Sequence, residues 1–107
     1  MSESKEQTPA QKLVGDLAPK LAELTDDVLF GDVWERAELS KRDRSLITVA
    51  ALIANGNTEQ LPGHLNRAKA NGISEAELSE VMTHLAFYAG WPRAISAIMV
   101  AKEVFKK

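Results

Sequence analysis

The sequence predicts an all-α protein, one small helical domain over residues 8–107 built around a central helical hairpin. Apolar residues recur at the three- and four-residue spacing of amphipathic helices, and capping residues precede most of these stretches. The hairpin is expected over residues 40–72. Its apolar run LITVAALIA would also suit a buried strand, but the length, the alanines and the preceding cap favour a helix, and no partner strand is predicted.

The N-terminal part is expected to hold two helical segments after a disordered polar tail over residues 1–7. The stretch TPAQ at 8–11 is a capping box with proline at the first helical position. Gly15 and Pro19 predict a break in the helix near Ala18. The second segment is expected over residues 19–30, with Gly31 as its C′ residue.

Further helices are expected, each opened by a capping residue or a first-turn proline: residues 40–55, 59–71 after Thr58, 75–89 and 92–105. Residues 46–54 have almost no polar face, so the first of these helices is expected to be buried all round. Trp34, in a short segment before them, is expected to anchor the core or an interface.

Composition restricts the possible partners. The formal net charge is −2 and the basic residues are scattered, which argues against binding to nucleic acid or to anionic membranes. The chain has no cysteine, so it has no disulfide, no thiolate nucleophile and no thiolate metal site. Without a signal-type apolar region or a membrane-length apolar run, a soluble cytoplasmic protein is expected.

Apolar residues make up 45% of the chain and occur in every predicted helix. A chain of 107 residues buries only about two thirds of the surface that its unfolded form exposes. We therefore expect the protein to self-associate, because a small monomer cannot easily hide so much apolar surface.

His64 is the first candidate for chemistry. It falls on the apolar stripe of its predicted helix, with Leu61, Leu65 and Ala68 at helical spacing. A half-buried imidazole can donate or accept a proton near neutral pH. The alternative is a core histidine that is hydrogen-bonded to a backbone carbonyl, and the sequence leaves both readings open.

Glu80, His84 and Tyr88 follow one another at four-residue spacing along one helix edge. They form either an acid/base relay in which Glu80 orients His84, or an ordinary solvated helix edge. A metal site using Glu80, His84 and His64 has a familiar ligand set, but no spacing motif supports it, and no metal is predicted. Arg42, Arg44 and Arg93 are candidates to bind a substrate carboxylate or are surface charges.

Three stretches together resemble the carboxymuconolactone decarboxylase family, relatives of the alkyl hydroperoxidase D-like proteins: RDRSLITVAALIA at 42–54, GHLNRAKANGISEAELSEV at 63–81 and AFYAGWPRAISA at 86–97. The resemblance implies an all-helical subunit that assembles into trimers or hexamers, with sites between subunits.

In the thiol-dependent branch of this superfamily, a CxxC pair precedes a histidine that corresponds to His64. The cysteine positions fall on Asn57 and Gln60, and a glutamate of the same branch falls on Ser45. The resemblance therefore implies that the peroxiredoxin activity attached to the family is absent, because both sulfurs are missing.

What remains resembles the decarboxylase branch, whose members remove carbon dioxide from a carboxylated muconolactone in aromatic-compound catabolism. The resemblance implies no cofactor, His64 as general acid/base, and an arginine as carboxylate binder. Trp91, Tyr88 and Trp34 are candidates for apolar walls or for core anchors. Two alternatives stay open: a thiol-free relative of the peroxidase branch without turnover, and a non-catalytic oligomeric protein that binds a small ligand.

Overall fold

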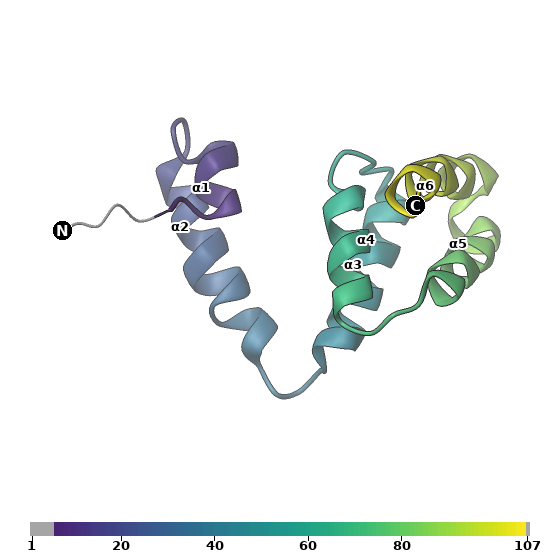
Figure 1. The fold of residues 1–107 in the computed structure, drawn as a ribbon, viewed down its shortest axis with the longest axis horizontal. Helices are drawn as coiled ribbons and strands as arrows, with labels where there is room; N and C mark the ends of the chain where they lie inside the picture. The colour runs from purple at the N-terminus through teal and green to yellow at the C-terminus, as the bar shows by residue number, and fades with distance from the viewer. Residues whose placement is uncertain (1–5, 107) are drawn as a thin grey trace. The chain divides into compact units, whose positions relative to one another are not determined.

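The computed structural model describes residues 6–106, and in that range it contains only helices, turns and irregular segments. The all-α prediction is confirmed. The residues form two compact units, one up to Leu39 and one from Ser40 (Figure 1). One helical domain over residues 8–107 is predicted from the sequence, and the described part of that range forms these two units. Most of the predicted N-terminal tail lies outside the described residues.

The N-terminal unit contains short helices: α1 (Pro9–Val14), α2 (Pro19–Leu24), the π-helix η1 (Thr25–Phe30) and the 3₁₀-helix η2 (Val33–Glu35). The predicted capping box is present at the start of α1, since the hydroxyl of Thr8 accepts from the N–H of Gln11 at 3.1 Å and the Gln11 side chain accepts in return. The break near Ala18 is also confirmed, because Ala18 is the N-cap of α2.

The end of this second segment differs from the prediction. Gly31 has a right-handed backbone with φ of −82° and is the C-cap of η1, so the left-handed C′ ending does not form. Its N–H donates to the carbonyl of Val28, three residues back, which closes the segment by tightening the last turn.

The C-terminal unit contains the longer helices: α3 (Lys41–Asn55), α4 (Leu61–Ala70), α5 (Glu75–Ala89) and α6 (Trp91–Val104). Ser40 caps α3, and its hydroxyl accepts from the N–H of Asp43 at 3.0 Å. Ser74 opens α5 with a full capping box. Gly56 and Gly90 separate helices with φ of +73° and +101°, values that favour glycine. The four predicted helices are confirmed within two residues at each end.

The start of α4 differs from the prediction. Gln60 rather than Thr58 is the N-cap, and α4 begins at Leu61 with Pro62 in its first turn. The N–H of Thr58 donates to the carbonyl of Gly56 at 3.0 Å, so Thr58 belongs to the tight turn that follows α3.

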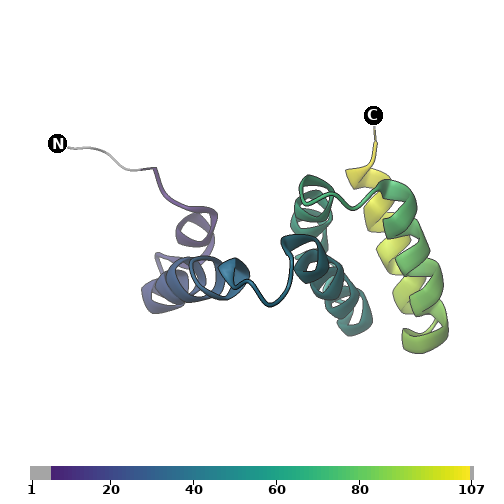
Figure 2. The ribbon, with the colours of Figure 1, turned by 90° about the horizontal axis from the view of Figure 1, so that it is seen from below.

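Helices α3 and α4 form the expected antiparallel hairpin, and α5 and α6 form a second hairpin that packs against it (Figures 1 and 2). The side chain of Asn71, just after α4, donates to the buried hydroxyl of Ser45 on α3 at 2.9 Å. The four helices share one apolar core: Val49, Ile53, Leu61, Leu65, Ala68, Ile73, Leu78, Met82, Ala97 and Ala101.

Helix α3 is not buried all round within this chain. Its buried residues Ser45, Val49 and Ile53 recur every four positions, and this is the side on which the core lies. Ile47 keeps 56% of its surface exposed. The prediction was wrong for the single chain because helices α4, α5 and α6 leave part of the α3 surface uncovered.

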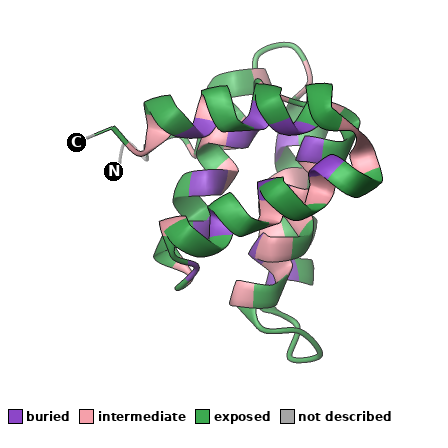
Figure 3. Cartoon of the chain, turned by 90° about the vertical axis from the view of Figure 1, so that its right-hand side faces the viewer, coloured by how far each residue is buried: buried purple, intermediate pink, exposed green. Residues whose placement is uncertain are grey.

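Helix α6 places small residues inward and large ones outward. Its buried residues are Ala94, Ala97 and Ala101, while Ile95 and Met99 are exposed. In Figure 3 the buried residues recur along the long helices with exposed residues between them. No helix in residues 6–106 is both long and apolar enough to cross a membrane.

Candidate functional site

His64 lies in the second turn of α4, between the buried leucines Leu61 and Leu65. Its side chain is half-buried, and its Nδ1 atom is enclosed by protein. Burial lowers the pKa of His64 below the ordinary value of 6.5, and the positive charge of Arg67 lowers it further. The imidazole is therefore mostly neutral at pH 7.

Arg93, near the start of α6, lies against the turn that ends α3. A Cβ atom added to Gly56 would be 1.7 Å from Nη1 of Arg93 and 2.9 Å from its Cζ. The guanidinium therefore occupies the space that a side chain at position 56 would fill. In residues 6–106 no hydrogen bond or ion pair to this guanidinium is found.

The other two candidate arginines are in different surroundings. Arg42 forms an ion pair with Glu77, the third residue of α5, so it joins the start of α3 to the start of α5. This contact and the Ser74 N–H lower the pKa of Glu77, with the backbone hydrogen bond the larger cause. Arg44 has a buried Nε atom and an interaction partner within the chain.

The register of the α3–α4 hairpin decides which candidates share an end of the unit. Because Asn71 pairs with Ser45, His64 lies level with about position 52 of α3. Position 52 and Gly56 are separated by roughly 6 Å along the helix axis, about one turn. Arg42 lies at the opposite end of α3, roughly 20 Å away from Gly56 along the axis. Arg93, and not Arg42, therefore lies at the same end of the hairpin as His64.

The predicted edge of α5 is an exposed surface. Glu80, His84 and Tyr88 are all exposed, and no hydrogen bond joins Glu80 to His84 in the part of the chain that the structure describes. The rings of His84 and Tyr88 lie 4.9 Å apart with a tilt of 31°. This geometry is that of a solvated helix edge, and a role of these side chains in substrate binding stays a prediction.

Trp91 lines an apolar groove between α5 and α6. Its ring contacts the ring of Phe87 edge-on at 5.1 Å. The groove has a volume of about 190 Å³, and no charged side chain lines it: its residues are Met82, Thr83, Ala86, Phe87, Trp91, Ala94, Ile95 and Ile98. Trp34 lies instead in the N-terminal unit, buried, with its ring 5.7 Å from that of Phe30.

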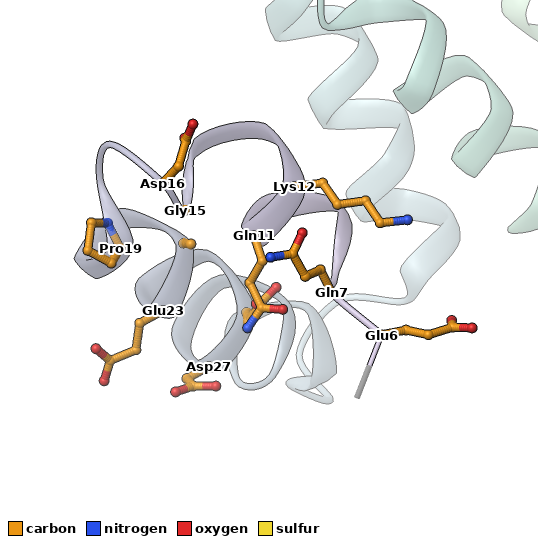
Figure 4. A pocket seen from close by; sticks show the side chains of 11 residues that line it. Glu6, Gln7, Gln11, Lys12, Gly15, Asp16, Pro19, Glu23 and Asp27 are labelled. Atoms are coloured by element: carbon orange, nitrogen blue, oxygen red, sulfur yellow. The ribbon is translucent and has the colours of Figure 1, made fainter. Parts of the chain in front are cut away.

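The N-terminal unit carries a wider open depression of about 720 Å³ (Figure 4). None of the predicted site residues lines it. Lys12 is the single basic residue in its lining, against five acidic ones: Glu6, Asp16, Glu23, Asp26 and Asp27. A carboxylate substrate would be repelled there.

Two residues beside His64 and Arg93 were not predicted as part of the site: Arg67 and Gly56. Arg67 follows His64 by three positions, so its influence on the imidazole could have been read from helical spacing. The role of Gly56 as the seat of Arg93 had no sequence signal beyond the helix stop, because it depends on the packing of α6 against α3.

The positions that correspond to the thiol branch have other roles here. Asn57 and Gln60 lie in the turn between α3 and α4, and Ser45 is hydrogen-bonded to Asn71 in the core. Among residues 6–106 no group of three or more His, Asp or Glu side chains is arranged to hold a metal ion.

The C-terminal unit is thus an all-α domain of two packed helical hairpins, and the central hairpin carries a half-buried histidine. The family model described as the carboxymuconolactone decarboxylase family matches residues 19–103, and the chain belongs to this family.

Three relatives illustrate the range of this similarity. The chain is 42% identical over 77 residues to 4-carboxymuconolactone decarboxylase of Acinetobacter baylyi, and the aligned stretch covers 72% of this chain and 58% of that protein. It is 35% identical over 81 residues to nitrosuccinic acid decarboxylase of Metarhizium robertsii, covering 76% and 57%. An uncharacterized 15.0 kDa protein of Paracoccus denitrificans is 26% identical over 97 residues, covering 89% and 69%. The chain thus spans less than three fifths of the length of the two decarboxylases.

Proposed function

We propose that this protein is a cofactor-independent decarboxylase of a small carboxylated lactone of the 4-carboxymuconolactone type, acting in aromatic-compound catabolism. The observation that carries the proposal is His64, a half-buried histidine whose pKa is lowered by burial, in a chain whose relatives include two proteins named decarboxylases. The missing cysteines favour this reaction over thiol-dependent peroxide reduction.

The names of the two relatives point to one kind of chemistry. In a carboxylated muconolactone and in nitrosuccinic acid, an electron-withdrawing group, the unsaturated lactone or the nitro group, can accept the electrons of a departing carboxylate. The bond between carbon and carboxylate breaks, carbon dioxide leaves, and the electron pair passes into the conjugated system. A proton then adds to carbon, so no external oxidant or reductant is needed.

His64 is the proposed proton donor. The proton passes from Nε2 of the imidazolium to the substrate carbon, and the imidazole regains a proton from solvent. Because the pKa of His64 lies below 6.5 in the free protein, only a small fraction carries this proton at pH 7. We expect kcat/KM to fall as the pH rises through that pKa, so the decline begins below pH 6.5.

The test is ultraviolet-monitored turnover of 4-carboxymuconolactone by the wild type and by His64→Ala. Loss of a general acid predicts a rate lower by about a hundredfold or more. Asn66→Ala is the matched control, since Asn66 is exposed on the same helix, and circular dichroism verifies that both variants fold. An active His64→Ala protein would contradict the role of His64. Binding without turnover by the wild type would instead favour a non-catalytic ligand-binding protein.

We also propose that the protein works as a homo-oligomer, a trimer or a hexamer, on a small-molecule substrate and without nucleic acid or membrane partners. Exposed apolar side chains support the assembly: Leu13, Leu17, Ile47, Phe87, Ile95 and Met99. Size-exclusion chromatography with light scattering tests it, and a monomer at micromolar concentration would contradict it.

A further inference from the structure

We infer that Arg93, seated against the side-chain-free position of Gly56, binds a carboxylate that the substrate keeps throughout the reaction. This inference rests on the proposed function and makes it more specific, because it assigns one of three candidate arginines and adds a glycine that the arginine requires. It implies that the protein acts on acids with at least two carboxylates.

The first support is the contact of the guanidinium with Gly56. Nη1, Cζ and Cδ of Arg93 would lie 1.7, 2.9 and 3.6 Å from a Cβ at position 56, so the arginine side chain runs across the glycine backbone. An arginine held in this way loses less conformational freedom when it binds a ligand than one that extends into solvent.

The second support is the availability of the guanidinium. Arg42 already pairs with Glu77, and Arg44 has a buried Nε atom and a partner within the chain. Arg93 makes no hydrogen bond or ion pair within residues 6–106. Its planar donor groups remain free for a carboxylate, which arginine binds with two parallel hydrogen bonds.

The third support is position. Arg93 lies at the end of the α3–α4 hairpin that also carries His64, and the two levels differ by about one helical turn along α3. Along the hairpin axis this separation is short enough for a small dicarboxylate to span. Binding of a negative charge near His64 would also raise the pKa of the imidazole, which opposes the effects of burial and Arg67.

The chemistry explains why the bound group is a retained carboxylate. A group that holds the departing carboxylate by charge would stabilise the reactant and lose the interaction as carbon dioxide forms. An arginine on the second carboxylate keeps its interaction from substrate to product. Because the interaction is equally strong in the substrate and in the transition state, it favours binding without opposing the reaction.

A structural role is the competing explanation, because a positive charge at the C-terminal end of α3 is favourable for the helix dipole. The experiment therefore compares Arg93→Gln with the wild type on 4-carboxymuconolactone and on its analogue with the retained carboxylate converted to an amide. We expect Arg93→Gln to raise KM about tenfold or more on the acid with little change in kcat, and to change the amide reaction little. Lys102→Gln, which removes a positive charge elsewhere on α6, is the control and should behave as the wild type.

The contact between Gly56 and Arg93 is tested by a second pair of variants. Gly56→Ala and Gly72→Ala place a side chain at φ of +73° and +97°, so both should lower the thermal midpoint. A Cβ at Gly72 meets no atom within 4 Å, whereas a Cβ at Gly56 meets the Arg93 guanidinium. We expect only Gly56→Ala to raise KM toward the Arg93→Gln value.

The outcomes separate the two proposals. An unchanged KM in Arg93→Gln, or an equal loss on the acid and the amide, overturns the carboxylate subsite and leaves the decarboxylase proposal intact. If calorimetry shows that the wild type binds 4-carboxymuconolactone but no turnover is observed, the decarboxylase proposal fails. The dissociation constants of Arg93→Gln and Gly56→Ala then test the carboxylate subsite. If the wild type neither binds nor converts it, both proposals are overturned.

Discussion

The two units of this chain both consist of helices with apolar residues at helical spacing, but they bury these residues to different extents. In the C-terminal unit, four helices of 10 to 15 residues enclose a shared core in which Leu65 and Leu78 have no exposed surface. In the described part of the N-terminal unit, only Ala22 and Trp34 are buried, and Leu17 keeps 90% of its surface exposed. Helical periodicity therefore predicts an apolar face, but it does not show that the same chain covers that face.

Helix length contributes to this difference. The helices α1 and α2 have six residues each, below the length at which an isolated helix is stable, so they depend on contacts with other elements. The long helices of the C-terminal unit supply those contacts to one another. The unit with the complete core is also the one that carries His64 and Arg93, and a fixed core can hold both side chains in place.

The largest expected effect that tests this comparison is the loss of a leucine. Leu65→Ala should lower the free energy of unfolding by about 2–5 kcal/mol, because it leaves a cavity in the core. Leu17→Ala should change it by less than about 0.5 kcal/mol in the isolated chain. Urea denaturation at low protein concentration measures both. An equal loss in the two variants would show that a partner covers Leu17 in solution.

A smaller effect is expected at the helix caps. Ser74 and Thr8 both form capping boxes, one at the 15-residue helix α5 and one at the six-residue helix α1. Ser74→Ala should lower the free energy of unfolding by about 1 kcal/mol. Thr8→Ala should have less than about half that effect, since α1 opens locally without exposing the core. Hydrogen exchange with mass spectrometry distinguishes local opening from global unfolding. A larger loss from Thr8→Ala would contradict the comparison.

The smallest effect concerns exposed ion pairs. Arg42–Glu77 joins two helices across 35 positions, whereas Lys20–Glu23 joins residues three apart within α2. The pKa of Glu77 is lowered in the folded state, so its contribution to stability is present above its ordinary pKa of 4.5 and is lost as the pH falls through the folded-state pKa. Glu77→Gln should make the thermal midpoint fall less steeply below pH 4.5. A wild-type slope in Glu77→Gln would refute the assignment to Glu77.

Sequence reasoning predicted the helices well where local chemistry decides them. The caps at Ser40 and Ser74 and the break before Pro19 were confirmed, because each depends on residues within one helical turn. The same reasoning was wrong about Thr58 and about the complete burial of α3. The first depends on how the chain leaves the preceding helix, and the second depends on how many helices pack around it.

The candidate site likewise has a part that the sequence predicted and a part that it could not. The stripe of α4 placed His64 beside buried leucines, which the structure shows, while its role as a proton donor stays a prediction. The three arginines were equivalent in sequence, since each is a charged residue near a helix start. Only the packing of α6 against α3, and of α3 against α5, separates Arg93 from Arg42.

The sequence by itself determined the family, the capped helix starts at Thr8, Ser40 and Ser74, and the lack of cysteine, because these depend on residue identity and on local hydrogen bonding. Only the tertiary structure decided that Gly56 leaves space for the Arg93 guanidinium, and that the core lies almost entirely after residue 40. Contacts between distant segments depend on the volumes and orientations of side chains that meet only when the helices pack.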